Sequence, residues 1–157
     1  MRLSVVIPAY NEERTISTVI TALLREVPDL HEIVVVDDGS TDRTADLAQS
    51  FCEQDPRIRL IRQPYNQGKT AALRAGFAAT TGDLVLVQDA DMEYDPVDIP
   101  MLIEPIVLGK ADVVFGSRFM IRRSARVLYF RHFMANQFLT FLSNVLTDLN
   151  LSDVETG

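Results

Sequence analysis

Three carboxylates follow a short apolar segment in the middle of the chain. Residues 84–87 read Leu-Val-Leu-Val, which predicts a buried strand, and Asp89, Asp91 and Glu93 come directly after it at alternate positions. Side chains two residues apart in extended backbone point the same way, so the three carboxylates can converge. Their hard oxygen atoms suit Mg2+ or Mn2+ better than zinc. We expect a divalent cation that holds a diphosphate; the alternative is a solvated acidic turn before Pro96.

Apolar segments of strand length alternate with segments of helical periodicity along the first 115 residues. The expected strands cover residues 3–8, 33–36, 58–61, 84–87 and 111–115, and the expected helices cover residues 12–25, 45–51 and 70–79. Such an alternation indicates βαβ units with right-handed crossovers. The predicted fold class is therefore α/β, with a mostly parallel twisted sheet flanked by helices.

Polar clusters follow every one of these expected strands. They begin after Ile7, Val36, Ile61, Gln88 and Phe115. Ligands of parallel α/β sheets bind outside the carboxyl ends of the strands, so five loops are expected to face one crevice. A single cluster of this kind is usually an ordinary turn, but five at the same edge predict an active site.

The residues in these loops suggest a nucleotide ligand. Asp37 and Asp38 could accept hydrogen bonds from a base N–H or a ribose hydroxyl, and Glu12 offers another acceptor. Tyr10 provides a ring on which a base could stack. Lys69, at the start of an expected helix, could meet a phosphate. These residues could therefore bind the base, the ribose and a phosphate of a nucleotide whose diphosphate is held by the cation.

The last third of the chain has a different charge pattern. Residues 113–147 contain no Asp or Glu but include five of the fifteen basic residues. Within them, residues 127–146 form an expected amphipathic helix, whose apolar stripe has steps of three or four and consists of Phe130, Met134, Phe138, Phe141 and Val145. The stripe either packs on the sheet or lies at a membrane surface.

Composition narrows the class of protein. A chain of 157 residues with 47% hydrophobic content is long enough for one domain with a full core. The lone Cys52 excludes a disulfide framework and a cysteine-based zinc site, and a reducing compartment is expected. The net charge of -7 argues against nucleic-acid binding. We find neither a signal sequence nor an uncharged apolar run of about 18 residues, so a cytoplasmic location is expected.

Four motifs together carry a family resemblance. They are Pro-Ala-Tyr-Asn-Glu at 8–12, Val-Asp-Asp-Gly-Ser-Thr-Asp at 36–42, Gln-Asp-Ala-Asp-Met-Glu-Tyr-Asp-Pro at 88–96 and Gly-Ser-Arg-Phe at 116–119. In this order they resemble the family 2 glycosyltransferases of the GT-A fold. The chain is most similar to the dolichol-phosphate and polyprenyl-phosphate mannose and glucose synthases, over essentially all 157 residues.

The resemblance implies roles for individual residues. Its metal ligands correspond to Asp89, Asp91 and Glu93, and Arg118 matches an arginine near the phosphates, which makes Asp91 and Arg118 the expected catalytic residues. Its nucleotide contacts correspond to Pro8, Tyr10, Glu12, Val36, Asp38 and Ala90. The acid-free segment, residues 113–147, is expected to hold an acceptor phosphate through Arg122, Arg123, Arg126 and Arg131.

The resemblance also implies an activity. It predicts an inverting glycosyltransferase that uses Mg2+ or Mn2+ to move a hexose from GDP-mannose or UDP-glucose to a polyprenyl or dolichyl phosphate at the cytoplasmic face of a membrane. The alternatives are a family member that acts on a hydroxyl acceptor, and a nucleotide-sugar-binding fragment without turnover. We expect a single domain over 1–157, with a nucleotide-sugar-binding core at 1–118 and an acceptor- or membrane-facing segment at 119–157. That segment is expected to be incomplete, because 152–157 resemble the beginning of a family motif that continues further.

Overall fold

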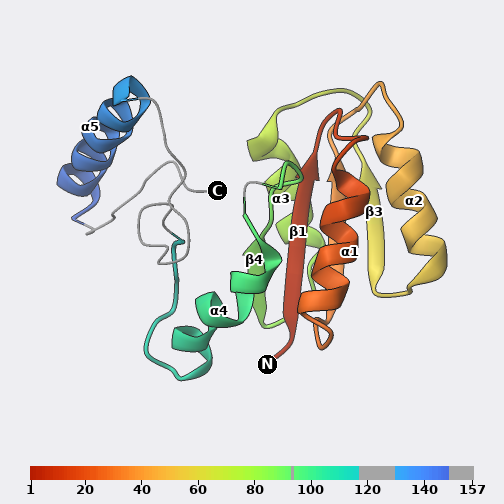
Figure 1. Cartoon of the computed structure of the whole chain (residues 1–157), viewed down its shortest axis with the longest axis horizontal. Helices are drawn as coiled ribbons and strands as arrows, with labels where there is room; N and C mark the ends of the chain where they lie inside the picture. The colour runs from red at the N-terminus through yellow and green to blue at the C-terminus, as the bar shows by residue number, and fades with distance from the viewer. Residues whose placement is uncertain (93, 117–129, 149–157) are drawn as a thin grey trace. The chain divides into compact units, whose positions relative to one another are not determined.

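The centre of the fold is a parallel sheet of four strands in the order β3-β2-β1-β4 (Figure 1). The strands are β1 (Leu3–Ala9), β2 (Glu32–Asp37), β3 (Ile58–Arg62) and β4 (Leu84–Val87). The computed structural model describes residues 1–92, 94–116 and 130–148. The parallel sheet and its alternation with helices confirm the predicted fold class.

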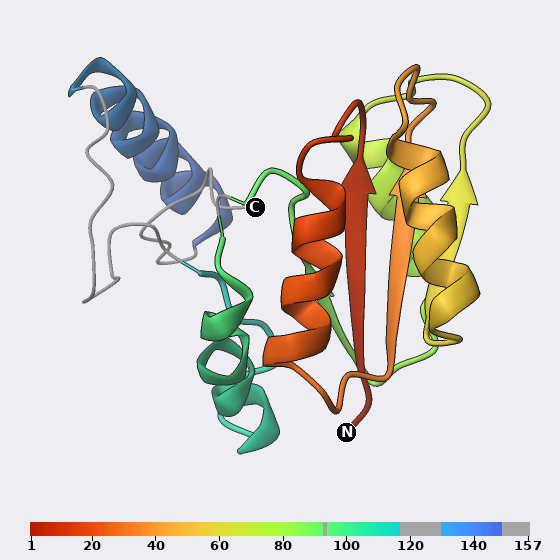
Figure 2. The same ribbon diagram turned by 45° about the vertical axis from the view of Figure 1, so that its right-hand side comes forward.

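Helices cover both faces of this sheet. Helices α1 (Ile16–Glu26) and α2 (Thr44–Gln54) lie on one face, and α3 (Lys69–Ala79) lies on the other (Figure 2). The chain moves outward from β1 through β2 to β3, and then crosses back to place β4 on the other side of β1. The strand order thus reverses between β1 and β4, and in doubly wound sheets ligands bind at such a reversal.

The core follows from the apolar composition of the two central strands. Every residue of β2 is buried, and in β1 only Pro8 is not fully buried. Near-continuous apolar runs are typical of strands that are covered on both faces. On the α3 face, Val6, Val34 and Val36 pack with Ala72. A side chain at Gly76 would overlap Val6, so the glycine lets α3 lie directly on β1.

The chain divides into two compact units, Met1–Pro100 and Met101–Gly157, and the boundary falls inside a helix. The first unit contains the sheet, α1 to α3 and the short 3-10 helix η1 (Pro96–Asp98). Helix α4 (Ile99–Val107) crosses the boundary and contains Pro105. The second unit also contains α5 (Phe130–Thr147), at the position of the expected C-terminal helix.

Two predictions about strands were wrong. Residues 111–116 form no strand in the structure, and Val113 and Phe115 are exposed. An apolar run favours extended backbone, but a strand also requires a neighbouring strand to which it can form hydrogen bonds. The sequence of residues 111–115 does not specify such a neighbour. Strand β4 pairs only with β1 within the described part of the chain, so it is an edge strand, and Val85 is 39% exposed instead of buried.

Helix α5 does not bury its predicted stripe. Met134, Phe138 and Phe141 are exposed, as is Val145. Among the described side chains of this helix, the buried ones are polar: the Thr140 hydroxyl donates a hydrogen bond of 3.2 Å to Asn136 Oδ1, and both residues are buried. The side chain of Phe130 lies outside those described. None of the helices described here combines the length and apolar character needed to cross a bilayer.

Candidate functional site

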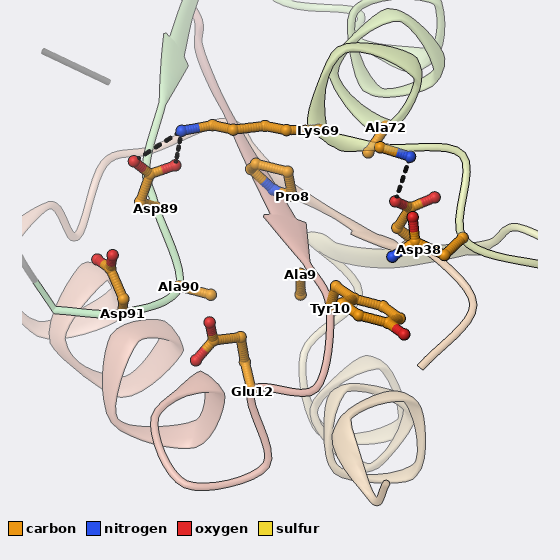
Figure 3. Close-up of a pocket in the computed structure, with 12 residues that line it drawn as sticks. Pro8, Ala9, Tyr10, Glu12, Asp38, Lys69, Ala72, Asp89, Ala90 and Asp91 are labelled. Carbon is orange, nitrogen blue, oxygen red and sulfur yellow. Dashed lines mark hydrogen bonds and ion pairs between the residues drawn. The ribbon is translucent and has the colours of Figure 1, made fainter. Parts of the chain in front are cut away.

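A pocket of about 280 Å³ lies at the carboxyl edge of the sheet, where the strand order reverses (Figure 3). Its walls come from the end of β1 and the segment after it, from the segment that follows β4, from the loops after β2 and β3 and from the first turn of α3. The lining residues are Pro8, Ala9, Tyr10, Glu12, Asp38, Asn66, Gly68, Lys69, Ala72, Asp89, Ala90 and Asp91. Four of the five polar clusters in the sequence therefore contribute to one pocket, whereas we predicted that all five would; no described residue of the cluster after Phe115 lines it.

The acidic and aromatic parts of this pocket are separate. Figure 3 shows the carboxylates of Asp89 and Asp91 on one side and the ring of Tyr10 on the other. Residues 90 and 91 lie in a turn, so the two carboxylates reach the same pocket through a turn and not through the extended backbone that we predicted. Tyr10 is 44% exposed, which leaves a face of its ring accessible.

Asp38 holds the loop that leads into α3. One carboxylate oxygen accepts a hydrogen bond of 2.8 Å from the N–H of Gln67, and the other accepts one of 2.8 Å from the N–H of Gly68. Charge-assisted hydrogen bonds of this kind are stronger than those between neutral groups. Asp38 itself is buried. The carboxylate that we predicted to accept from a nucleotide is thus engaged by the chain's own backbone.

The loops after β1 and β2 are tied together in a similar way. The N–H of Asn11 donates to Ser40 Oγ, and Asn11 Oδ1 accepts from the N–H of Thr41, each over 2.9 Å. These bonds hold Asn11 in a left-handed conformation with φ 57°. The N–H of Glu12 donates to Thr44 Oγ1 over 2.7 Å. Glu12 therefore reaches the pocket from a loop that is anchored to its neighbour.

Asp42 completes this network at the start of α2. Burial alone would raise the pKa of Asp42, but hydrogen bonds from the hydroxyl and the N–H of Thr44 and from the N–H of Glu13 together lower it. The ionised form of the Asp42 carboxylate is thereby favoured, and it accepts hydrogen bonds from Thr44, the first residue of α2.

An ion pair crosses the acidic side of the pocket. Lys69 Nζ lies 2.7 Å from Asp89 Oδ1 and 2.9 Å from Asp89 Oδ2, so one ammonium group meets both carboxylate oxygens. Lys69 is the first residue of α3, directly after the loop held by Asp38. On this side of the pocket, the negative charge of Asp89 is therefore paired with the positive charge of Lys69.

The oxygen atoms of this side suit a divalent cation. The described residues contain no group of three or more His, Cys, Asp or Glu that could hold a metal ion. Mg2+, however, is usually bound by one or two carboxylates together with substrate phosphates and water. Asp89 and Asp91 offer two carboxylates in one pocket, and Asp89 already attracts a cation in the form of Lys69. The donor set fits Mg2+ or Mn2+ that shares its coordination with a diphosphate.

Some predicted site residues are not placed in this pocket. Val36 and Asp37 are buried in β2 and do not line it. One oxygen of Asp37, Oδ1, is buried and has no hydrogen-bond partner among the described residues. Several others lie outside the described residues, namely Glu93, Arg118, Arg122, Arg123 and Arg126. Arg131 belongs to α5, but its side chain is not among those described.

The pocket also contains residues that sequence reasoning did not single out. They are Ala9, Asn66, Gly68 and Ala72. Asn66 and Gly68 carried a signal, because they belong to the polar cluster in which only Lys69 was selected. Ala9 lies in the motif at residues 8–12 but was not selected, and Ala72 lay in no motif, since a small apolar residue in a helix is typical of the core.

The sequence matches the profile of glycosyl transferase family 2 over residues 4–155. The chain therefore belongs to this family. It is 39% identical over 121 residues to dolichol-phosphate mannosyltransferase from Pyrococcus furiosus, covering 76% of this chain and 34% of that protein. It is 42% identical over 127 residues to undecaprenyl-phosphate 4-deoxy-4-formamido-L-arabinose transferase from Pseudomonas paraeruginosa, covering 78% and 37%. The chain thus spans about a third of the length of these relatives.

A solved structure shares the fold. Glucosyl-3-phosphoglycerate synthase from Mycobacterium tuberculosis, crystallised with Mn2+, UDP-glucose and phosphoglyceric acid, is 35% identical to the chain with a TM-score of 0.59. The match covers 69% of this chain and 40% of that one. A crystal structure of the same synthase with UDP gives a TM-score of 0.60, with 32% identity, and covers 75% and 46%. The expected family and fold are confirmed.

Proposed function

We propose that this chain is a domain of an inverting glycosyltransferase that moves a hexose from a nucleotide sugar to a polyprenyl or dolichyl phosphate. The observation that carries the proposal is the pocket itself, in which an accessible tyrosine ring and two carboxylates converge at the reversal of strand order. The names of the relatives supply the acceptor class, since both act on polyprenyl-type phosphates by name.

The two sides of the pocket match the two parts of a nucleotide sugar. A base would stack on Tyr10, with the backbone of Pro8 and Ala9 beside it. The diphosphate would lie toward Asp89, Ala90 and Asp91. GDP-mannose and UDP-glucose are both candidate donors. A volume of about 280 Å³ suits part of such a ligand, because pockets for whole drug-sized ligands span roughly 300–1,000 Å³.

Asp89 and Asp91 would hold the metal ion, which supplies positive charge to neutralise the departing nucleoside diphosphate. The Mn2+ in the solved synthase structure supports a divalent ion in this family. Asp91 would act as a catalytic residue through this charge. Lys69 would add a second positive group near the phosphates. Glu93 and Arg118, which lie outside the described residues, complete the proposed site.

The proposed reaction is one displacement at the anomeric carbon. An acceptor oxygen attacks the face opposite the leaving diphosphate, so the configuration inverts. A lipid phosphate is already ionised at neutral pH and needs no strong general base. Its charge would be met by the acid-free segment through Arg122, Arg123, Arg126 and Arg131.

We place the acceptor at the cytoplasmic face of a membrane. The exposed apolar residues of α5, among them Phe138 and Phe141, support contact between this helix and a lipid surface. Four arginines of the acid-free segment, Arg118, Arg122, Arg123 and Arg126, precede α5 in the sequence and would favour an anionic surface. The proposed domain covers 1–157, with the core at 1–118.

A second candidate acceptor has an observation in its favour. The solved synthase that resembles this chain was crystallised with phosphoglyceric acid, a small molecule and not a lipid. A family member that transfers to a hydroxyl group would need a carboxylate to remove the hydroxyl proton. Among the described carboxylates that line the pocket, Asp38 holds the loop before α3, and Asp89 and Asp91 are assigned to the metal ion, so Glu12 is the candidate for that role.

A thermal-shift panel tests the proposal. The chain is heated with GDP, UDP, ADP or CDP, each with Mn2+ and with EDTA. A ligand that binds the native state raises the melting temperature, so one diphosphate should give a selective shift that requires Mn2+. Equal shifts with all four, or none with any, would contradict a specific sugar-nucleotide site. Radiolabelled sugar transfer to polyprenyl phosphate, compared with phosphoglyceric acid, then separates the two acceptor classes.

A further inference from the structure

The ion pair between Lys69 and Asp89 occupies a carboxylate that the proposed function assigns to a metal ion. Lys69 Nζ engages both oxygens of Asp89, at 2.7 and 2.9 Å. The Asp89 side chain is only 16% exposed, whereas that of Lys69 is 52% exposed. The Asp89 carboxylate is therefore held in place by its surroundings, whereas about half of the Lys69 side chain is exposed and its ammonium group can turn away from Asp89.

Lys69 and a divalent cation require the same oxygen atoms. Mg2+ binds carboxylate oxygen at about 2.1 Å and tolerates little distortion of its octahedral coordination. An ammonium group that donates to both oxygens of Asp89 uses part of their lone-pair capacity, and two positive charges at one carboxylate repel each other. A cation at Asp89 therefore competes with the ion pair to Lys69.

The backbone beneath Lys69 is held, so only its side chain is free to move. Asp38 accepts hydrogen bonds from Gln67 and Gly68, the two residues before Lys69. A lysine side chain has a flexible stem of four carbons and three donors that can rotate. Once released from Asp89, the ammonium group stays in the same pocket, where the diphosphate of a nucleotide is the next acceptor.

We propose that Lys69 is an exchangeable counter-ion: it pairs with Asp89 until a divalent cation takes that carboxylate, and it then binds the diphosphate of the donor. This inference rests on the proposed function, which supplies the cation and the diphosphate. The exchange couples the two ligands, because the cation frees a positive group for the nucleotide, and the nucleotide in turn holds Lys69 away from Asp89. Such coupling is reciprocal by thermodynamic necessity.

The exchange predicts opposite effects of one substitution on two ligands. In Lys69→Met, and in Lys69→Gln as a second variant, Mn2+ alone should bind more tightly, because its competitor has gone. GDP or UDP in saturating Mn2+ should bind more weakly, because a phosphate partner has gone. Each change should be roughly two- to five-fold, the range for one partly exposed ion pair. Both are measured by calorimetry on the whole 157-residue chain.

A double-mutant cycle separates exchange from general electrostatics. With EDTA present, Asp89→Asn should bind GDP or UDP more tightly than the unsubstituted chain, since Lys69 is already released. The gain should vanish in Asp89→Asn combined with Lys69→Met. Asp91→Asn is the matched control: it removes the same charge from the same pocket but leaves the pair between Lys69 and Asp89 in place, so its effect should not depend on Lys69.

The outcomes distinguish this inference from the proposed function. Unchanged Mn2+ affinity in both Lys69 variants, or an Asp89→Asn gain that persists in the double variant, would overturn the exchange. Mn2+-dependent binding of GDP or UDP by the unsubstituted chain would then still support the proposed function. If the unsubstituted chain binds neither nucleotide with Mn2+, the proposed function fails, and the exchange fails with it.

Discussion

Gly39 lies directly against Tyr65. A side-chain carbon on Gly39 would stand 2.5 Å from the carbonyl carbon of Tyr65 and 2.7 Å from the backbone nitrogen of Asn66, and Gly39 has a φ of +70°. The loop after β2 and the loop after β3 are therefore in backbone contact, which no residue with a side chain allows. This contact, together with the Asp38 hydrogen bonds, sets where α3 begins.

Gly39→Ala should damage both stability and ligand binding. The alanine would be strained at positive φ and would push the Tyr65–Asn66 backbone away, which displaces the loop that carries Lys69. We expect a loss of about 2 kcal/mol in the free energy of unfolding, of which roughly 1 kcal/mol comes from φ alone. Affinity for GDP or UDP with Mn2+ should fall at least about ten-fold. Urea denaturation and calorimetry measure the two effects.

Gly109→Ala is the control for that substitution. Gly109 has a φ of +66°, but a carbon added there would have no neighbour within 4 Å. It tests the cost of positive φ without the clash, and nucleotide affinity should not change. A Gly39→Ala chain that binds nucleotide as well as Gly109→Ala does would show that the contact with Tyr65 does not position the site.

Asp38→Asn should destabilise the chain even without ligand. The two oxygens of Asp38 each accept from one backbone N–H, of Gln67 and of Gly68, and the asparagine must turn an NH2 group toward one of them. We expect a loss of about 1–2 kcal/mol in the free energy of unfolding, the cost of one unsatisfied buried donor. If ligand-free stability is unchanged while nucleotide affinity falls, Asp38 acts by direct contact and not through the loop.

Asp91→Ala should abolish metal-dependent nucleotide binding. The substitution leaves Asp89, already engaged by Lys69, as the remaining described carboxylate of the proposed metal site. The Mn2+-dependent part of the GDP or UDP thermal shift should disappear, while the melting temperature without ligand stays within about 2 °C, as for most surface changes. Asp29→Ala removes an equal charge from an exposed position outside the pocket and should keep the shift. An unchanged shift in Asp91→Ala would contradict the proposed metal site.

Much of this site could be predicted because its signals are local. Strand-length apolar runs and helical spacing are properties of neighbouring residues, and parallel strands bring their carboxyl ends to one edge. Tyr10, Lys69, Asp89 and Asp91 were each visible as polar residues after a strand, and all four line the pocket. The pairing of β1 with β4, which places the first motif beside the third, was not predicted, because no single residue specifies which strands become neighbours.

The remaining features depend on which segments become neighbours. The engagement of Asp38 by the loop after β3 required the knowledge that β2 pairs with β3. The run at 111–115 resembled the other strands, but its pairing is not a local property, and no strand forms there. In α5 the spacing of apolar residues predicted the helix but not its buried side, where Asn136 and Thr140 bond to each other.

Glu32 gives the fold a predictable dependence on pH. Burial alone would raise its pKa, but hydrogen bonds from the N–H and hydroxyl of Thr81, from the Ser4 hydroxyl and from Arg59 lower the pKa from 4.5 to about 2. Its ionised form is therefore favoured in the native state. The contribution of the Glu32 carboxylate to the free energy of unfolding is complete above about pH 5. It is lost as the pH falls toward 2, because Glu32 takes up a proton in the unfolded chain at a higher pH than in the native state.

Glu32→Gln should remove this dependence. The free energy of unfolding at pH 7 should fall by about 2 kcal/mol, because a neutral amide replaces a buried ion that accepts four hydrogen bonds. From pH 6 to pH 3 the unsubstituted chain should lose about 2 kcal/mol more than the variant, as the two pKa values require. Urea denaturation at several pH values measures this difference. Glu53→Gln changes an exposed carboxylate of α2 and should keep the full dependence. Parallel curves for Glu32→Gln and the unsubstituted chain would show that Glu32 is not held ionised by these partners.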